Sequence, residues 1–279
     1  VKTAFPLGVS TSAAPSLRGE YFTLEFGGNN EVAATENYVK AISELSWSQF
    51  YMPDVLVGSP EWLSIKKAAE SYGWRVVVKD SCPVYGVDLS DGDFSDYLKS
   101  LGSNTRLKLF NRRKNLQTLG KVEIENIWPE KERFFKILND FHRVRWGKPC
   151  YSGLNAEFIS ILLDELCVDG HLIDLSVMTL NGEPISAALD VAVNGRTYNL
   201  QAGYLEDFAK NISLGTLHLG YQIEKAYATE GVSFYDFMAG TGKNANYKAA
   251  IANASSEFNT LMLVRNPLIK LLYKLKGTL

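Results

Sequence analysis

The stretch that decides the fold is HLIDLSVMTL-NG-EPISAALDVAV-NG-RTYNLQAGY, residues 171–204. Its apolar and polar residues alternate with a period of two, which indicates β-strands. Asn181-Gly182 and Asn194-Gly195 interrupt the alternation, and an Asn-Gly pair between two strands favours the two-residue turn of a hairpin. The sequence therefore predicts an antiparallel meander of three strands, at 171–180, 183–193 and 196–204.

Strand and helix patterns alternate before the meander, which favours an α/β layer. We expect strands at 21–26, 49–57, 74–79 and 84–89, with Ser81-Cys82-Pro83 between the last two, and helices at 31–45 and 60–72. A helical stretch at 94–119, interrupted at Gly102-Ser103, precedes a strand at 121–127 and helices at 130–146 and 155–168, the last with Asn155 as N-cap. Residues 1–19 are rich in Ser, Ala, Pro and Gly and are expected to be poorly ordered.

The pattern after the meander continues with both element types. We expect a helix at 214–230, a strand at 233–238, a helical turn at 245–252, a strand at 257–264 and a terminal helix at 268–276. The predicted fold class is therefore a mixed α/β (α+β) fold, with a domain boundary in the region 90–103.

The composition is that of a globular protein. Hydrophobic residues make up 46% and charged residues 22% of the 279 residues, which excludes a disordered chain. The 29 basic and 31 acidic side chains give a net charge of −2, so the whole-chain charge does not indicate a DNA-binding or membrane-surface protein, although a local basic patch is compatible with it. Three widely spaced cysteines indicate a reducing compartment, here the cytoplasm. The chain shows no signal-peptide pattern and no apolar run near the ~18 residues of a membrane span.

The loop after the meander is the first candidate site. It reads Lys210-Asn211-Ile212-Ser213-Leu214-Gly215-Thr216 and leads into a helix with Ser213 as N-cap. The first N–H groups of a helix lack partners within it and carry the positive end of its dipole. Gly215 would let an anion approach the backbone, so the loop is able to bind a diphosphate. The alternative is an ordinary capped helix whose glycine packs against a neighbour.

A run of basic side chains is the second candidate. No acidic residue interrupts it, and Arg112 falls three residues after Leu109 on the apolar stripe of the predicted helix. A guanidinium at the edge of a core suits bidentate binding of phosphate or carboxylate, which favours an anionic acceptor. The alternative is a solvated helix face with one snorkelling arginine. The run consists of Lys99, Arg106, Lys108, Arg112, Arg113, Lys114 and Lys121.

The third candidate is the strand Tyr235-Asp236-Phe237-Met238-Ala239-Gly240, followed by Tyr247-Lys248. Asp236 is a charge inside an apolar strand, so it either has a partner or lies at a catalytic strand end. An Asp near a Lys or Tyr can orient the proton of a nucleophile or stabilise an oxyanion. The alternative is a structural Asp that accepts hydrogen bonds from backbone N–H groups.

Other common site motifs are absent from the sequence. His142, His171 and His218 do not have metal-ligand spacing, so no metal is predicted. The Walker, GxGxxG and GxSxG patterns do not occur. We expect His142 to be an interfacial residue rather than a catalytic one, and Cys150 to be a small packing residue.

The order of the predicted elements resembles the Gcn5-related N-acetyltransferase (GNAT) superfamily. Within it, the chain is most similar to the CelD-like acyltransferases associated with cellulose biosynthesis, which are related to the FemAB peptidoglycan peptidyltransferases. The resemblance covers about residues 20–265 and implies two tandem Gcn5-like units, a reduced one at 20–100 and a complete acyltransferase domain at 101–279. The residues that carry it are Asp96-Tyr97-Leu98, Arg106, Arg112-Arg113, Leu119-Gly120, Arg145-Trp146-Gly147-Lys148, 181–187, Tyr235-Asp236-Phe237, Gly240 and Tyr247-Lys248.

The resemblance also implies a site. In this superfamily acyl-CoA lies between two strands that part after the meander, and no metal takes part. Backbone groups of Leu200, Gln201 and Ala202, up to Tyr204, would bind the pantetheine and the thioester, and the loop from Lys210 and Asn211 through Ser213, Leu214, Gly215 and Thr216 would bind the pyrophosphate. The superfamily's usual loop has more glycines than this one. The resemblance further implies Asp236, Tyr247 and Lys248 as catalytic residues and Arg106, Arg112, Arg113 and Trp146 as acceptor-binding residues.

The expected function is therefore transfer of an acyl group, with acetyl as the expected group, from acyl-CoA to an amine or hydroxyl. The acceptor would be a small-molecule or lipid-linked sugar precursor of a bacterial cell-surface polysaccharide. One alternative is a FemAB-like transferase that uses aminoacyl-tRNA on a peptidoglycan precursor. The other is a non-catalytic protein that keeps only the fold and binds a ligand or a partner.

Overall fold

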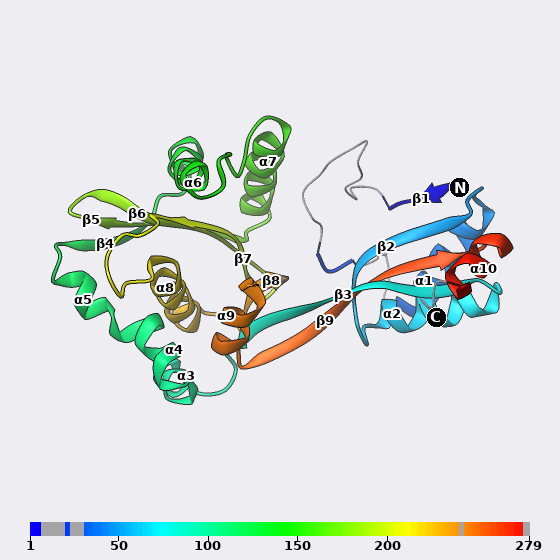
Figure 1. Ribbon diagram of the computed structural model, residues 1–279, viewed down its shortest axis with the longest axis horizontal. Coiled ribbons are helices and arrows are strands. Elements are labelled where there is room, and N and C mark those ends of the chain that lie inside the picture. The colour runs from blue at the N-terminus through cyan, green and yellow to red at the C-terminus, as the bar shows by residue number, and fades with distance from the viewer. Residues whose placement is uncertain (7–19, 23–30, 240–242, 276–279) are drawn as a thin grey trace. The chain divides into compact units, whose positions relative to one another are not determined.

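The computed structural model describes residues 1–6, 20–22, 31–239 and 243–275, with side chains from Thr35 in the first helix and from Tyr247 in the ninth. The chain forms two units, whose elements are labelled in Figure 1. Unit 1 comprises residues 1–84, 239–241 and 255–279, and unit 2 comprises residues 85–238 and 242–254. Within the described part of the chain, no helix is long and apolar enough to cross a membrane.

Unit 1 is a sheet with helices on both faces. Its strands are ordered β1-β2-β9-β3. Side chains alternate along β9, so that Leu261 and Leu263 join the core cluster that α1 and α2 cover, whereas Met262 and Val264 pack with Ile269 of α10. The elements are β1 (Thr3–Ala4), α1 (Glu31–Glu44), β2 (Gln49–Leu56), α2 (Pro60–Ser71), β3 (Arg75–Asp88), β9 (Ala254–Val264) and α10 (Pro267–Leu275).

Unit 2 is a larger sheet ordered β3-β8-β7-β6-β5-β4, in which residues 85–88 of β3 take part. Helices α6 and α7 lie on one face of the strands and α8 lies on the other, with α3–α5 packed outside it (Figure 1). The elements are α3 (Phe94–Ser100), α4 (Ser103–Arg106), the π-helix η1 (Leu107–Asn111), α5 (Arg113–Gln117), β4 (Val122–Asn126), α6 (Lys131–Trp146), α7 (Leu154–Val168), β5 (Leu172–Leu180), β6 (Glu183–Val193), β7 (Arg196–Tyr204), α8 (Leu214–Ala228), β8 (Phe234–Ala239) and α9 (Lys243–Ile251).

The meander predicted from the Asn-Gly pairs is confirmed. Strands β5, β6 and β7 pair antiparallel in sequence order. Asn181 and Gly182 have φ angles of 52° and 86°, and Asn194 and Gly195 have φ angles of 49° and 79°. Positive φ at both central residues is what a type I′ turn requires. The predicted mixed α/β fold class is confirmed as well, since β7 and β8 are parallel and the meander is antiparallel.

Two local predictions were wrong. The strands expected at 74–79 and 84–89 form one strand, β3, because Cys82 and Val84 on either side of Pro83 are both buried and packing continues the extended chain. The helical stretch expected at 94–119 is confirmed with its interruption, since Leu101 is extended (ψ 143°) and Gly102 is the N-cap of the next helix; the π-helix η1 within it was not predicted. The N-cap of α7 is Gly153 rather than Asn155. Most of the strand expected at 21–26, most of segment 1–19 and Gly240 lie outside the described residues.

Candidate functional site

Strands β7 and β8 pair over only part of their length. Their parallel register comprises Arg196 with Phe234, Thr197 with Tyr235, and Tyr198 with Asp236. Beyond this last pair β7 continues to Tyr204 and β8 continues to Ala239. The two strands therefore part, and we call residues 199–204 of β7 and 237–238 of β8 the fork.

An irregularity in β7 accounts for the fork. The register of β6 with β7 shifts between Leu189, which faces Gln201, and Asp190, which faces Asn199, so Leu200 is an extra residue on β7. A bulge of this kind bends its strand and increases its local twist. β7 therefore turns away from β8 just beyond their last paired residues.

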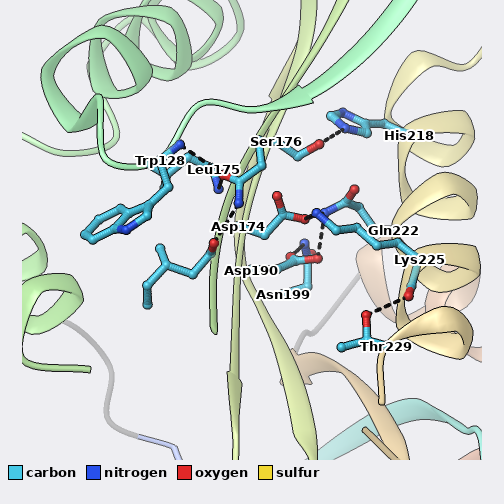
Figure 2. Close-up of polar contacts among 12 residues, drawn as sticks. Trp128, Asp174, Leu175, Ser176, Asp190, Asn199, His218, Gln222, Lys225 and Thr229 are labelled. Atoms are coloured by element: carbon cyan, nitrogen blue, oxygen red, sulfur yellow. Dashed lines mark hydrogen bonds and ion pairs between the residues drawn. The ribbon is translucent and has the colours of Figure 1, made fainter. Parts of the chain in front are cut away.

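A buried carboxylate lies on the α8 side of the point where the strands part (Figure 2). Asp190 is 2% exposed and accepts hydrogen bonds from Asn199 Nδ2 (2.6 Å), Tyr235 Oη (2.6 Å) and Gln222 Nε2 (3.0 Å). Burial raises the pKa of Asp190 to about 6, although the hydrogen bond from Tyr235 opposes that rise. Asp190 thus connects β6, β7, β8 and α8 where the fork begins.

Asp174 of β5 extends this cluster toward solvent. Gln222 Nε2 and Lys225 Nζ both donate to its Oδ2, each at 2.8 Å. Its Oδ1 is buried and has no hydrogen-bond partner among the described residues. The Lys225 ammonium compensates the charge of Asp174, and the amide of Gln222 links the two carboxyl groups.

A second polar chain fixes β7 from the same side. His218 Nε2 lies 2.9 Å from Ser176 Oγ, and its Nδ1 lies 2.9 Å from Ser186 Oγ, which in turn donates to the Gly203 carbonyl (3.2 Å). Burial lowers the pKa of His218 to about 3, so the ring is neutral at physiological pH. This histidine is a structural residue that holds the fork segment of β7.

Helix α6 covers the opposite side of the same segment. His142 Nε2 donates to the Ala202 carbonyl (3.1 Å), and Arg145 Nη1 donates to Tyr204 Oη (2.5 Å). Burial is the main cause that lowers the pKa of His142, so its imidazole is neutral at pH 7. Because Nε2 carries the proton in this hydrogen bond, Nδ1 of the neutral ring carries a lone pair.

Helix α9 brings two of the predicted catalytic residues to the fork. Lys248 Nζ donates to the carbonyls of Phe237 (2.5 Å) and Met238 (2.9 Å), which form the β8 edge of the fork. Burial raises the pKa of Tyr247. The nearby Tyr204 raises this pKa further, and the charge of Arg145 lowers it. Electrostatic coupling of this kind requires proximity, so Tyr247 lies at the same end of unit 2 as Tyr204.

The amino end of α8 completes the site. Ser213 makes no side-chain cap hydrogen bond, and its Oγ instead lies 3.0 Å from Thr216 Oγ1. The first helical hydrogen bond runs from Leu217 N to the Ser213 carbonyl (2.9 Å). The N–H groups of residues 214–216, which precede it, are therefore available to bind an anion. Leu214 is buried, whereas Lys210 and Asn211 are exposed.

Gly215 lies in contact range of Tyr204. A Cβ atom at Gly215 would come within 2.5 Å of Cε1 of the Tyr204 ring. A glycine is therefore needed here for close packing, as the alternative interpretation of the sequence held. The same contact places the amino end of α8 beside Tyr204, the last residue of the fork. The two explanations are compatible, since close packing of Tyr204 leaves the amides of the first turn unchanged.

Asp236 has structural partners. It is fully buried, its Oδ2 accepts from Arg196 Nη1 (2.8 Å), and its Oδ1 accepts from the Met238 backbone N–H (2.7 Å). It belongs to the last paired row before the fork. Its catalytic role stays a prediction, and the hydrogen bonds favour the structural alternative.

Two of the predicted acceptor arginines have partners on α3 and α8, and their acceptor role stays a prediction. Arg113 forms an ion pair with Glu224 and its guanidinium lies 3.5 Å from the centre of the Tyr221 ring. Arg106 Nη1 donates to the Leu98 carbonyl (3.4 Å), and Arg112 ends η1. Trp146, in contrast, is 58% exposed at the end of α6, next to Arg145.

Sequence reasoning gave no side-chain role to Arg145 or Tyr204, and it gave His142 an interfacial role. His142 and Arg145 are three residues apart, so they share one face of α6, and this spacing was the available signal. Their partners lie about 60 residues away on β7, which no local pattern reveals. Burial raises the pKa of the Cys150 thiol to about 11, which agrees with the packing role predicted for it.

Unit 2 is thus a mixed sheet whose parallel neighbours part beside the amino end of a helix. The sequence model of the Acetyltransferase (GNAT) domain family matches residues 103–249, more than half of the chain. The chain belongs to this family. No curated protein matches the chain.

Solved structures agree on the fold. FemX is 14% identical, with a TM-score of 0.60 over 91% of this chain and 82% of FemX. A conserved protein of unknown function from Bacteroides thetaiotaomicron is 11% identical, with a TM-score of 0.58 over 86% of this chain and 77% of its own. The C-terminal domain of an Agrobacterium fabrum protein named for lysylphosphatidylglycerol synthetase is 11% identical, with a TM-score of 0.54 over 89% and 77%. The predicted relation to the GNAT superfamily and to FemAB proteins is thus confirmed at the level of family and fold.

Proposed function

We propose that the protein transfers an acyl group from an acyl-CoA to an amine or hydroxyl, and that the fork holds the thioester. The observation that carries this proposal is that β7 and β8 stop pairing at Tyr198 and Asp236, immediately beside the uncapped amino end of α8. Strand edges supply backbone groups to an extended thioester arm, and the helix end supplies N–H groups and positive dipole to a diphosphate. In this proposal unit 1 is a reduced copy of the same fold.

The proposed chemistry is direct attack of the acceptor on the thioester carbonyl, followed by departure of the thiol. Neutral His142 would accept the proton of the acceptor at Nδ1 while Nε2 remains bonded to the Ala202 carbonyl. The Lys248 ammonium and backbone N–H groups of the fork would stabilise the oxyanion. Tyr247 and Tyr204, at the same end of unit 2, would position the acceptor. The proposed acceptor is a sugar precursor of a cell-surface polysaccharide, made in the cytoplasm.

A second candidate is transfer from aminoacyl-tRNA, as the resemblance to FemAB proteins implies. The fold likeness to FemX, with a TM-score of 0.60, supports it equally. The two candidates differ in the donor, and the loop with one glycine at Ser213-Leu214-Gly215-Thr216 is compatible with either. Parallel calorimetric titrations with acetyl-CoA, longer acyl-CoAs and aminoacyl-tRNA decide between them.

A carboxylate at the amino end of α8 is expected to weaken donor binding. Gly215→Glu places a negative charge where the diphosphate would lie, so the affinity for acyl-CoA should fall at least about tenfold, or ~1.4 kcal/mol. Gly215→Ala is the matched control, because it also displaces the Tyr204 ring but adds no charge. Equal losses in the two variants, measured by calorimetry, would show that the effect comes from Tyr204 and would remove the helix end from the donor site.

The role of His142 predicts a particular pH profile. His142→Gln keeps a donor for the Ala202 carbonyl but has no lone pair of comparable basicity, so kcat should fall about a hundredfold with donor affinity retained. A base must be neutral, so wild-type activity should be lost as the pH falls through the lowered pKa of His142. That acidic limb should be missing from the Gln variant. An unchanged limb would assign the base to another group.

A further inference from the structure

The helix α10 of unit 1 presents an apolar face that is exposed among the residues of the unit that the structure describes. Leu268, Leu271, Leu272 and Leu275 of α10 are 72%, 52%, 56% and 75% exposed. They stand at positions i, i+3, i+4 and i+7, which lie on one side of a helix. Four exposed leucines on two turns form a contiguous apolar patch, and such patches on soluble proteins mark interaction surfaces.

The helix is held in place by its opposite side. Ile269 is buried and Tyr273 is half-buried, and both pack on the sheet of unit 1 with Val77 and Met262. Asn266 Oδ1 accepts from the Leu268 N–H (2.9 Å) and so caps the helix. The leucine face is therefore preformed and does not depend on a partner for its helical conformation.

Basic groups lie on and near α10, and acidic ones are absent from the sequence of this helix. Lys274 is exposed on α10, Lys270 donates to the Gly73 carbonyl (2.5 Å), and Lys79 Nζ lies 5.0 Å from the centre of the Tyr273 ring. No Asp or Glu follows Glu257 in the chain. The net charge of the whole chain conceals this local positive patch.

We propose that α10 docks the protein on the surface of a bilayer that contains anionic phospholipids. A helix with leucines on one side and lysines beside them, lying in the interface plane, binds through apolar area and through attraction to anionic headgroups. A second copy of the chain is the less favoured occupant, because a two-fold contact through α10 would bring Lys274 against the like charges of its partner. The inference does not depend on the acyltransferase activity.

Helix α7 of unit 2 provides an internal control. Leu154 and Val168 are 82% and 81% exposed, so its apolar groups are as accessible as those of α10. Exposed acidic groups accompany them, namely Glu157, Glu165 and Asp169. Equal apolar exposure with the opposite charge should not bind an anionic bilayer, so the two helices separate the lipid interaction from general hydrophobic adhesion.

The test is co-sedimentation of the full chain with vesicles of phosphatidylcholine alone and of phosphatidylcholine mixed with phosphatidylglycerol. We expect the wild type to bind only the mixed vesicles and to be released by salt. Leu268→Ser/Leu275→Ser should lower partitioning about tenfold or more, whereas Leu154→Ser/Val168→Ser should leave it unchanged. Lys274→Glu, which removes no apolar group, should also weaken binding to the mixed vesicles. This variant replaces the double α10 variant as the test if the latter proves unstable in thermal unfolding.

Several results would overturn the proposal. These are a wild type that stays in the supernatant with both vesicle types, equal losses in the α7 and α10 variants, or binding to phosphatidylcholine alone that matches the mixed vesicles. Light scattering without lipid provides one more test. A dimer that dissociates in the α10 variant would assign the leucine face to a second copy of the chain.

Discussion

Replacement of Lys248 by Met is expected to slow acyl transfer at least a hundredfold, which corresponds to about 2.7 kcal/mol of activation free energy. The Lys248 ammonium donates to the carbonyls of Phe237 and Met238 at the edge of the fork. Its loss removes a cation from the place where we propose that the oxyanion forms and leaves two carbonyls without this donor. The measurement is a comparison of kcat with donor affinity, and only kcat should change strongly.

Lys248→Arg is the control for charge. Arginine keeps the cation but has a different geometry, so it should retain more activity than Met. The hydrogen bonds to two carbonyls favour the protonated amine and hence a role as cation. A base role would require the neutral amine, and activity would then rise with pH through the titration of the lysine. A Met variant that turns over at the wild-type rate would show that positioning alone accounts for catalysis.

The local signals in the sequence predicted the fold well where the chain determines its own conformation. The Asn-Gly pairs at 181 and 194 predicted both hairpin turns, because few other residues adopt positive φ at two successive positions. The prediction was wrong at Pro83. There the burial of Cys82 and Val84 decides the local conformation, and burial depends on parts of the chain that lie far away in sequence.

The candidate site was predicted in part for a similar reason. The segments of β7, α8 and α9 that the sequence analysis named lie at the fork, and their role as a donor site stays a prediction. Acceptor binding by the arginines stays a prediction. The ion pair of Arg113 with Glu224 of α8 was not predicted, because only the folded structure brings the two residues together. His142 reaches Ala202 from a separate helix, so the sequence contained no local sign of the contact.

The register also explains why Asp190 and Asp174 were missed. They face each other across β5 and β6, and Asp190 faces Asn199 of β7 in the next pair of strands. An Asp in a strand of alternating polar and apolar residues predicts a solvent-exposed side chain. Helix α8 instead covers the face of the sheet that carries Asp190 and supplies Gln222 as a donor. The polar row thus exists only when three strands and one helix come together.

Removal of the Asp190 carboxylate is the change expected to affect stability most. In Asp190→Ala three donors lose their acceptor, from Asn199, Tyr235 and Gln222. Asn199 is half-buried, whereas Tyr235 and Gln222 are buried. Buried donors without partners cost about 1–3 kcal/mol each, so the unfolding free energy should fall by at least about 2 kcal/mol. Denaturant titration at neutral pH measures it. A loss below about 1 kcal/mol would mean that water or neighbouring groups satisfy the donors.

Asp190→Asn tests the same group through pH. The pKa of Asp190 is raised to about 6 in the folded protein, above the ordinary value of 3.8, so the native state retains a proton that the unfolded state has released. The contribution of Asp190 to the unfolding free energy is therefore full below about pH 4, decreases as the pH rises toward 6, and is constant above that. The decrease amounts to about 3 kcal/mol. Exposed carboxylates such as Asp140, whose pKa is lowered by its hydrogen bond with Lys136, change stability in the opposite direction and contribute equally to both proteins. The difference in unfolding free energy between wild type and Asp190→Asn should therefore decline between pH 4 and 6. A difference that is constant with pH would show that Asp190 is ionised in the folded protein at acidic pH, and that its three donors and the Gln222 link to Asp174 outweigh the cost of its burial.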